Sequence, residues 1–178
     1  MRIKLFQPNN QPVKPVSVPP TRFDRILDLV ALFLIVLLWV LAISFFIDDA
    51  PDKIPTGFDA AGNPRGWGSA AFYFLMPVIA TPVVGLMFLS TRYPQLINLP
   101  VALRQQVIVP QSALMIRCCR WLNIVCEVMM LFILIFMAGF QYETLYMDSD
   151  IFVAGIYGTV ILMFVVIIYY SVRISRVK

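Results

Sequence analysis

Histidine is absent from this chain of 178 residues, and charged residues are scarce, at 13% of the total. The absence of histidine excludes Ser–His–Asp triads, histidine general bases and histidine-ligated metals. A soluble globular domain carries about 25% charged residues and about half apolar residues, whereas apolar residues make up 60% of this chain. A water-soluble fold of this size could not bury so much apolar surface, so the composition predicts an integral membrane protein.

Cysteine is also rare, and the spacing of Cys118, Cys119 and Cys126 forms no C-x-x-C pair. This spacing favours neither a zinc site nor a redox motif, and we expect reduced thiols near or inside the membrane. Without histidine, an HExxH motif or converging acids, the sequence predicts no enzyme, no catalytic residues, no metal site and no cofactor. Basic residues are not interleaved with aromatic residues on a soluble face, so we expect no nucleic-acid partner.

Long apolar runs are what the sequence does have. A membrane-crossing helix needs about 20 mostly apolar residues, and four stretches qualify, of which only the third contains an acid and none contains Lys or Arg. These stretches predict an all-α membrane protein, a four-helix transmembrane bundle that crosses the membrane repeatedly. The expected spans are Leu29–Ile47, Ala70–Leu89, Trp121–Phe140 and Ile151–Tyr170.

The basic residues indicate which side of the membrane each connection occupies, because loops rich in Lys and Arg stay cytoplasmic. Twelve of the fourteen basic residues fall before the first span, between the second and third, or after the fourth. Only Lys53 and Arg65 fall in the other two loops. We therefore expect both ends of the chain inside (N-in, C-in) and a multi-pass location in the cytoplasmic, or inner, membrane of the cell.

The polar segments outside the spans differ in composition. Residues 1–24 form a proline-bearing cytoplasmic leader, and residues 25–178 form the four-span membrane domain. Prolines divide the segment Ser90–Arg120, and Pro100 is expected to begin a short amphipathic helix along the inner leaflet. The loop Gln141–Asp150 is long enough only to turn the chain.

The first outer loop, Asp48–Ser69, combines glycines that permit positive φ with prolines that fix φ. This composition predicts successive tight turns in an extracytoplasmic loop. Two interpretations are open: a rigid hairpin-like cap that joins two helices, or a surface that recognises an extracytoplasmic peptide or a membrane-protein partner. The candidate partner-binding residues are Pro55, Phe58, Asp59, Gly62, Pro64, Trp67 and Gly68.

Glu127 is the one charged residue inside the predicted spans. A carboxylate in hydrocarbon is unfavourable and usually faces a bundle interior, a partner or a water path. Arg120, Asn123 and Glu127 fall on one helix face, at i, i+3 and i+7, and form a candidate intramembrane polar site. Glu127 is either a gate, proton site or partner contact, or a structural carboxyl group that is protonated or hydrogen-bonded to Asn123 or to another helix. Without a basic neighbour in any predicted span, it is expected to be neutral at pH 7.

Ala154 and Gly158 form a small-xxx-small pair on the fourth span, and such pairs allow two helices to approach closely. The contact is either internal to the bundle or between the subunits of a homo-oligomer. We favour internal packing.

The segment Asp52–Ser69, DKIPTGFDAAGNPRGWGS, resembles the signature of a membrane family, the domain of unknown function at the start of the sporulation-delaying-protein (Sdp-type) immunity proteins. The family's histidine position is Gly57 here, and its aspartate after Gly-x-Pro is Arg65. The resemblance covers about Leu29–Phe140 and implies a multi-span architecture with an immunity-like role. The matching positions are Pro55, Phe58, Asp59, Gly62, Pro64, Trp67, Gly68 and Ser69, then Pro77, and a second match is Asn98-Leu99-Pro100-Val101.

The sequence thus predicts a non-enzymatic integral membrane protein that recognises an extracytoplasmic peptide or a membrane partner in an immunity-like or sensor-like role. The lipid bilayer is its other expected partner. The alternative is a subunit of a transporter or channel, which would need paired polar residues or inverted repeats near the midplane of the membrane.

Overall fold

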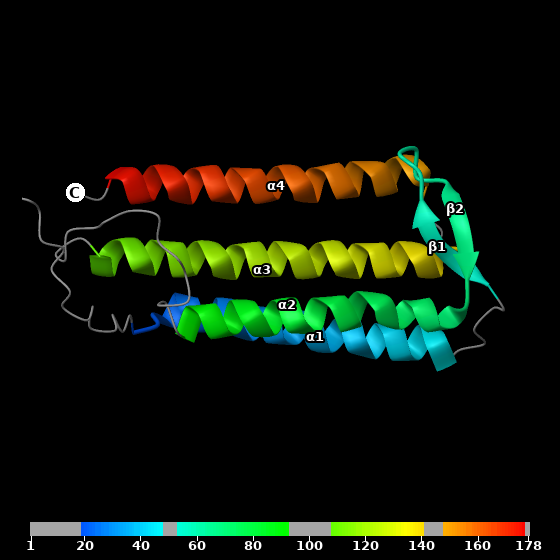
Figure 1. The fold of residues 1–178 in the computed structure, drawn as a ribbon, viewed down its shortest axis with the longest axis horizontal. Coiled ribbons are helices and arrows are strands. Elements are labelled where there is room, and N and C mark those ends of the chain that lie inside the picture. Colours follow the sequence, from blue (N-terminus) through cyan, green and yellow to red (C-terminus); the bar gives the residue numbers. More distant parts are fainter. Residues whose placement is uncertain (1–18, 48–52, 93–107, 141–147, 177–178) are drawn as a thin grey trace, which may run out of the picture.

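The computed structural model describes residues 19–47, 53–92, 108–140 and 148–176 (Figure 1). Three predicted features lie outside this described part: residues 1–18 of the predicted leader, the predicted amphipathic helix at Pro100 and residues 141–147 of the predicted second outer loop. The elements are, in chain order, α1 (Arg22–Ile47), β1 (Ile54–Phe58), β2 (Pro64–Gly68), the 3-10 helix η1 (Ala70–Phe74), α2 (Leu75–Arg92), α3 (Ile108–Gly139) and α4 (Ser149–Arg176).

The described residues include four helical stretches that are long and apolar enough to cross a membrane, which confirms the predicted four-span fold. The helices alternate in direction, so α1 begins and α4 ends at the same end of the bundle (Figure 1). We call this the charged end, because salt bridges link Asp24 and Asp28 to Arg117 and Arg120 there. The opposite end, where the strands lie, is the hairpin end. The stretches are Arg22–Ile47, Ala70–Leu89, Gln111–Gly139 and Ser149–Arg176.

Helices α1 and α3 begin well before the predicted starts of their spans at Leu29 and Trp121. The additional turns carry charged residues that pair between the two helices, so these residues continue the helices beyond the apolar runs. Thr21 caps α1 reciprocally: Asp24 N–H donates to Thr21 Oγ1 at 3.2 Å, and Thr21 N–H donates to Asp24 Oδ2 at 2.9 Å. This capping box places the start of α1 at Arg22.

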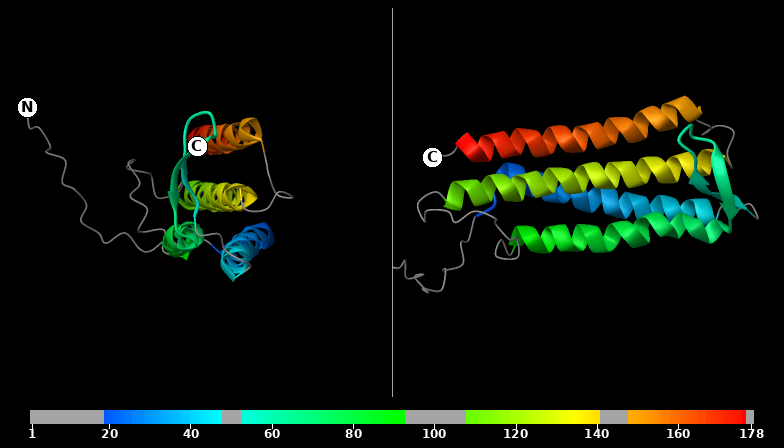
Figure 2. Two further views of the ribbon diagram at one scale, coloured as in Figure 1. Left: turned by 90° about the vertical axis from the view of Figure 1, so that its right-hand side faces the viewer. Right: turned by 45° about the horizontal axis from the view of Figure 1, so that its top comes forward.

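Helix α3 is the central element of the bundle. It packs against α1 and α2 on one side and against α4 on the other, as the left view of Figure 2 shows. Helix α4 has two buried residues, Phe152 and Tyr170. Most of the α4 surface therefore faces outward, where lipid would cover it.

The expectation that Ala154 and Gly158 pack inside the bundle is wrong. Both residues are exposed, and no heavy atom lies within 4 Å of a Cβ placed on Gly158. The close approach is made by Gly155, where an added Cβ would meet the ring of Phe132 at 2.4 Å. Gly155 shares its helix face with buried Phe152, three residues earlier, and so α4 presents a face to α3 that differs from the predicted one.

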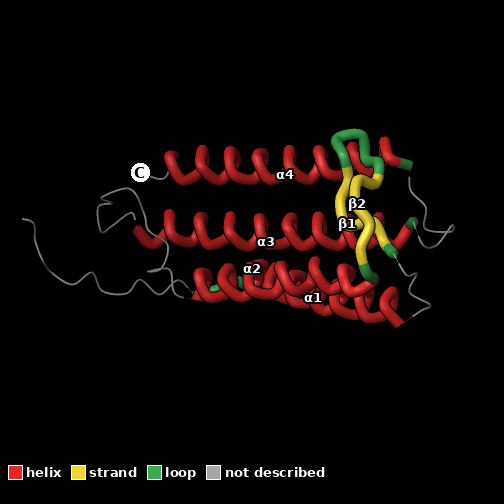
Figure 3. The backbone as a smooth tube through the Cα atoms, turned by 45° about the vertical axis from the view of Figure 1, so that its right-hand side comes forward, coloured by secondary structure: helices red, strands yellow, loops and turns green. Residues whose placement is uncertain are grey.

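Strands β1 and β2 form an antiparallel pair that we call the β1–β2 hairpin. Ile54 pairs with Gly68 and Pro55 with Trp67, and the register shifts on either side of Gly57. The hairpin lies across the end of the helices, as Figure 3 shows. At its base the Ser69 hydroxyl accepts a hydrogen bond from Ala71 N–H at 3.3 Å, so the chain passes directly from β2 into η1 and α2. The sequence predicted tight turns here but no strands.

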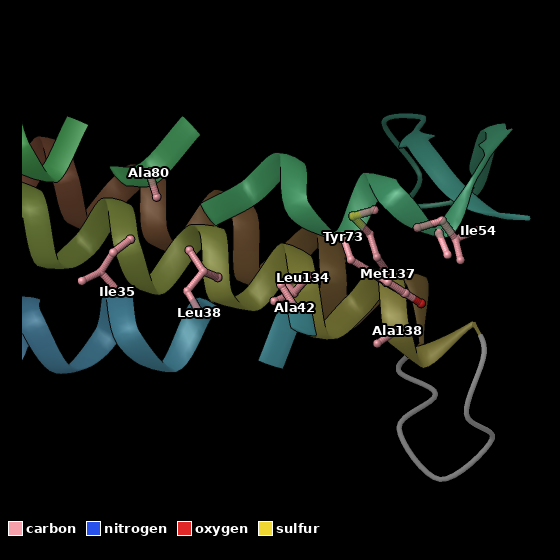
Figure 4. Packing of buried hydrophobic residues seen from close by; sticks show 10 residues of the cluster. Ile35, Leu38, Ala42, Ile54, Tyr73, Ala80, Leu134, Met137 and Ala138 are labelled. Carbon is pink, nitrogen blue, oxygen red and sulfur yellow. The ribbon is translucent and has the colours of Figure 1, made fainter. Parts of the chain in front are cut away.

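The main buried cluster joins α1, α2, α3, η1 and β1 (Figure 4). Its α1 members, Ile35, Leu38 and Ala42, recur every three or four residues and therefore share one face of the helix. Tyr73 of η1 is fully buried and Ile54 of β1 is 1% exposed, so the base of the hairpin belongs to the core of the bundle. The hairpin is therefore fixed to the helices.

Candidate functional site

Asp59 builds the turn of the β1–β2 hairpin. Its Oδ1 accepts hydrogen bonds from the backbone N–H groups of Ala61 and Asn63, both at 2.9 Å, and its Oδ2 accepts one from Asn63 Nδ2 at 3.4 Å. Asp59 N–H also donates to the carbonyl oxygen of Asn63 at 2.9 Å. Gly62 takes a φ of 81°, in the left-handed region that glycine adopts readily. The carboxylate of Asp59 is therefore occupied by the turn itself.

The hairpin turn is expected to loosen in acid. The hydrogen bond from Asn63 N–H holds the pKa of Asp59 below its ordinary value. The ionised Asp59 carboxylate therefore stabilises the turn fully above its unfolded-state pKa of about 3.9. This stabilisation is lost as the pH falls through the lower pKa of the folded state. The ¹⁹F signal of fluorotryptophan at Trp67, followed from pH 7 down to pH 2 in detergent, would report this loosening.

Asp59→Asn is the matched control, because it keeps the acceptor Oδ1 but removes the titrating group. We expect its ¹⁹F signal to stay constant over the same range, and Asp59→Ala to give the loosened signal at every pH. An equal acid transition in Asp59→Asn would contradict the assignment.

Phe58 anchors the hairpin on two helices. Its ring centroid lies 4.9 Å from that of Phe136, 5.7 Å from that of Phe140 and 4.9 Å from that of Phe152. Phe136 lies in the last turn of α3 and Phe140 directly follows that helix, whereas Phe152 lies at the start of α4. Aromatic pairs at these separations attract each other beyond the area they bury. One side chain thus connects the hairpin to both helices.

Three further residues predicted to bind a partner are used in packing. Pro55 is among the fully buried side chains. A Cβ on Gly62 would lie 2.8 Å from the carbonyl oxygen of Ser149, and a Cβ on Gly68 would lie 2.6 Å from Cγ2 of Thr56. The tip of the hairpin therefore rests on the first residue of α4. These three residues maintain the position of the hairpin.

The outward face of β2 carries Arg65 and Trp67. Residues along β2 alternate between exposed and half-buried, so Arg65 and Trp67 stand on one side while Pro64 and Gly68 are half-buried. Trp67 is 56% exposed. Arg65 forms no salt bridge with any residue of the described ranges. Of the seven predicted residues, Trp67 has the large side chain that is free for a partner.

A network of ion pairs joins α1 to α3 at the charged end. Arg117 Nε lies 2.8 Å from Asp24 Oδ1, and Arg120 Nε lies 2.7 Å from Asp28 Oδ1. Arg120 Nη1 also lies 3.4 Å from Asp24 Oδ1. In this network two cations balance two anions. Arg120 and Asp24 are buried, at 9% and 6% exposed, whereas the side chains of Arg117 and Asp28 are each 26% exposed. Such a network is destabilised strongly when one member is removed.

Asn123 and Glu127 form a second polar pair, deeper in the bundle. Asn123 Nδ2 donates to Glu127 Oε1 at 2.9 Å, and the two residues are 6% and 2% exposed. Arg120 does not join them, because its guanidinium bonds to Asp24 and Asp28 of α1. The structure therefore divides the predicted intramembrane site into an ion-pair network and an amide–carboxyl pair.

Sequence reasoning missed Asp24 and Asp28 as partners of the arginines. A signal was available: the two acids are four residues apart near the start of the first helix, and Arg117 and Arg120 are three apart near the start of the third. Each pair lies on one helix face. Parallel placement at the same end of the bundle brings them together.

Glu127→Gln is expected to change the free energy of unfolding by less than about 1 kcal/mol. Within the described ranges, Asn123 Oδ1 and Glu127 Oε2 are buried without a hydrogen-bond partner. A neutral carboxyl group at position 127 has one O–H that can donate to an acceptor such as Asn123 Oδ1. The amide of glutamine has an N–H that can donate in the same place. Thermal unfolding in detergent would measure the change.

Glu127→Ala provides the contrast, because it leaves Asn123 Nδ2 without an acceptor and opens a cavity. We expect it to cost about 2–4 kcal/mol. A loss for Glu127→Gln as large as that for Glu127→Ala would show that the charged carboxylate is needed.

Possible metal ligands do not gather in the part of the chain that the structure describes. No group of three or more His, Cys, Asp or Glu residues is placed there to hold a metal ion. Cys118, Cys119 and Cys126 are free thiols.

Comparisons with known proteins give a match to one domain family and to one relative over most of the chain. Residues 33–81 match the Domain of unknown function (DUF1648), which supports the resemblance seen in the loop and covers the end of α1, the hairpin, η1 and the start of α2. An uncharacterized protein of Archaeoglobus fulgidus is 31% identical over 162 residues, covering 86% of this chain and 84% of the relative. No solved structure matches the chain. The chain therefore belongs to the family of this archaeal protein, with four helices able to span a membrane and a segment of the DUF1648 type.

Proposed function

We propose that this protein recognises an extracytoplasmic peptide or membrane-protein partner through the exposed face of the β1–β2 hairpin, without catalysing a reaction. The observation that carries the proposal is a large aromatic side chain, Trp67, held 56% exposed on a hairpin whose other side is fixed to the bundle. Trp and Arg are enriched among the residues that dominate binding interfaces. If the partner is a toxic peptide, its recognition is the immunity-like role that the resemblance implies.

The rigidity of the hairpin supports binding rather than mere closure of the bundle end. The hydrogen bonds of Asp59 fix the turn, and the ring contacts of Phe58 fix the strands on α3 and α4. A surface that is ordered before it binds loses little entropy on association. A cap alone would not require Trp67 and Arg65 side by side on its outward face. Together they favour a partner that offers an apolar group beside a carboxylate.

The proposal requires the hairpin end to face outward, in an N-in and C-in orientation in the cytoplasmic membrane. Arginines concentrate at the charged end, where α1 and α3 begin and α4 ends, as cytoplasmic segments do. A reporter fused after Lys178 is expected to stay in the cytoplasm, and one fused after Ser69 is expected to be exported. Export of the C-terminal reporter would overturn the orientation and, with it, the proposed site.

The test of recognition uses a photo-crosslinking amino acid at position 67 of the full chain in native membranes. We expect a defined crosslinked product that disappears in an Arg65→Ala background. The matched control places the same amino acid at Tyr157, which is 58% exposed on α4 and outside the hairpin.

Two results would go against the proposal. One is a Trp67→Ala variant that fails to accumulate, since an exposed indole should be dispensable for folding; the hairpin would then be a structural cap. The other is a crosslinked product that forms equally at position 157 or is unaffected by Arg65→Ala.

A further inference from the structure

A groove of about 660 Å³ runs between α1 and α2 in the half of the bundle near the charged end. The right view of Figure 2 shows the two helices farther apart at the charged end than at the hairpin end. The volume is within the range of about 300–1,000 Å³ that is typical of ligand sites. Apolar side chains form most of the walls, among them Leu27, Ala31 and Ile35 of α1 and Val84 and Phe88 of α2.

Two features of α2 keep the groove open and limit its depth. Gly85 lines it, and no heavy atom lies within 4 Å of a Cβ placed on that residue. At the inner end, Trp39 Nε1 of α1 donates a hydrogen bond to Thr81 Oγ1 of α2 at 3.0 Å. This bond joins the helices where the groove ends. On the side of the hairpin end, the groove therefore ends at this bond.

The mouth of the groove carries an excess of positive charge. Arg25, Asp28 and Arg120 line it, and Arg120 is paired with Asp28 at 2.7 Å. Arg25 is exposed and forms no salt bridge with a residue in the described ranges. Two arginines and one aspartate leave one guanidinium uncompensated at the place where α1 enters the apolar region.

The dimensions of the groove correspond to one leaflet of a bilayer. From Arg25 to Ile35, α1 rises by about 15 Å, which is half of a hydrocarbon core of about 30 Å. We propose that the groove holds one acyl chain of an anionic glycerophospholipid from the leaflet at the charged end, with the lipid phosphate bound by Arg25. Apolar walls accept the chain, and the uncompensated guanidinium selects the negative headgroup. This inference is independent of the partner proposed for the hairpin.

The experiment uses the full chain in nanodiscs with equal amounts of phosphatidylglycerol and phosphatidylcholine, followed by native mass spectrometry after mild detergent extraction. We expect one retained phospholipid per chain, with phosphatidylglycerol preferred about fivefold, as one basic residue near anionic lipid contributes about 1 kcal/mol. Arg25→Gln should retain a lipid but lose the preference. Arg176→Gln, at the end of α4 and outside the groove, should keep it.

Gly85→Phe should fill the groove and abolish retention. Gly158→Phe is its matched control, because Gly158 also has open space around an added Cβ but lies on α4, away from the groove. Equal retention of the two lipids by the unmodified chain would overturn the proposal. So would retention by Gly85→Phe as strong as that by Gly158→Phe. If Gly85→Phe does not accumulate, an unchanged preference in Arg25→Gln is enough to refute it.

Discussion

Replacing Arg120 by alanine is expected to lower the free energy of unfolding by about 3–5 kcal/mol. The guanidinium lies 2.7 Å from Asp28 and 3.4 Å from Asp24, and its side chain is 9% exposed. Its removal would leave Asp28, whose side chain is 26% exposed, without its partner, and the buried Asp24 with Arg117 alone. An uncompensated charge in such a place costs far more than the intact pair contributes. Thermal unfolding of the purified chain in detergent at pH 7 would measure the loss.

Arg117→Ala is the matched comparison for this prediction. The Arg117 side chain is 26% exposed, and its partner Asp24 keeps Arg120 when Arg117 is removed. We expect a clearly smaller loss. Replacing Arg120 and Asp28 together by leucine should recover most of the stability, because apolar pairs of similar size often replace buried ion pairs without loss. Equal losses for Arg120→Ala and Arg117→Ala would show that burial does not set the strength of the network.

Phe58→Ala is expected to cost about 3 kcal/mol and to release the hairpin from the helices. The substitution removes three ring contacts, with centroids 4.9–5.7 Å apart, that connect β1 to α3 and α4. The Trp67 fluorotryptophan signal should narrow as the outer part of the hairpin gains freedom, while Ile54 keeps the base of the hairpin in the main buried cluster. Phe58→Leu, which restores most of the volume, should recover about half of the loss.

Phe33→Ala serves as the control for the loss of a large aromatic side chain, because Phe33 is 64% exposed on the outward face of α1. Its loss is expected to be below about 1 kcal/mol. A hairpin that keeps its ordered ¹⁹F signal in Phe58→Ala would mean that Asp59 and Pro55 are sufficient to hold it.

The helical spans could be predicted from the sequence, because each is a long apolar run and a bilayer admits few other solutions. The starts of α1 and α3, which carry charged residues, could not be predicted from the sequence. The rule that charged residues end a span placed the starts at Leu29 and Trp121, but α1 and α3 continue through residues whose charges neutralise one another. Whether a charge has a partner depends on which helices are neighbours. A single sequence does not contain that information.

The segment Asp48–Ser69, predicted to be an outer loop, shows the same division between local and tertiary information. Its glycines and prolines predicted tight turns, and the turn at Asp59 and Gly62 has this form. The contact of Phe58 with Phe152, across most of the chain, had no local signal. For the same reason Ala154 and Gly158 indicated close packing on the wrong face of α4. The close approach of α3 and α4 occurs at Gly155, which packs against the ring of Phe132 on α3.

The contact between the hairpin tip and the start of α4 has a consequence for the timing of assembly. The hairpin is synthesised directly after the first helix, whereas Ser149 and Phe152, which it touches, belong to the last one. A growing chain presents its segments in order from the N-terminus. The contacts of the hairpin with Ser149 and Phe152 can therefore form only after the fourth helix has been synthesised. A chain interrupted before α4 would keep the turn of Asp59 but would lack these two contacts.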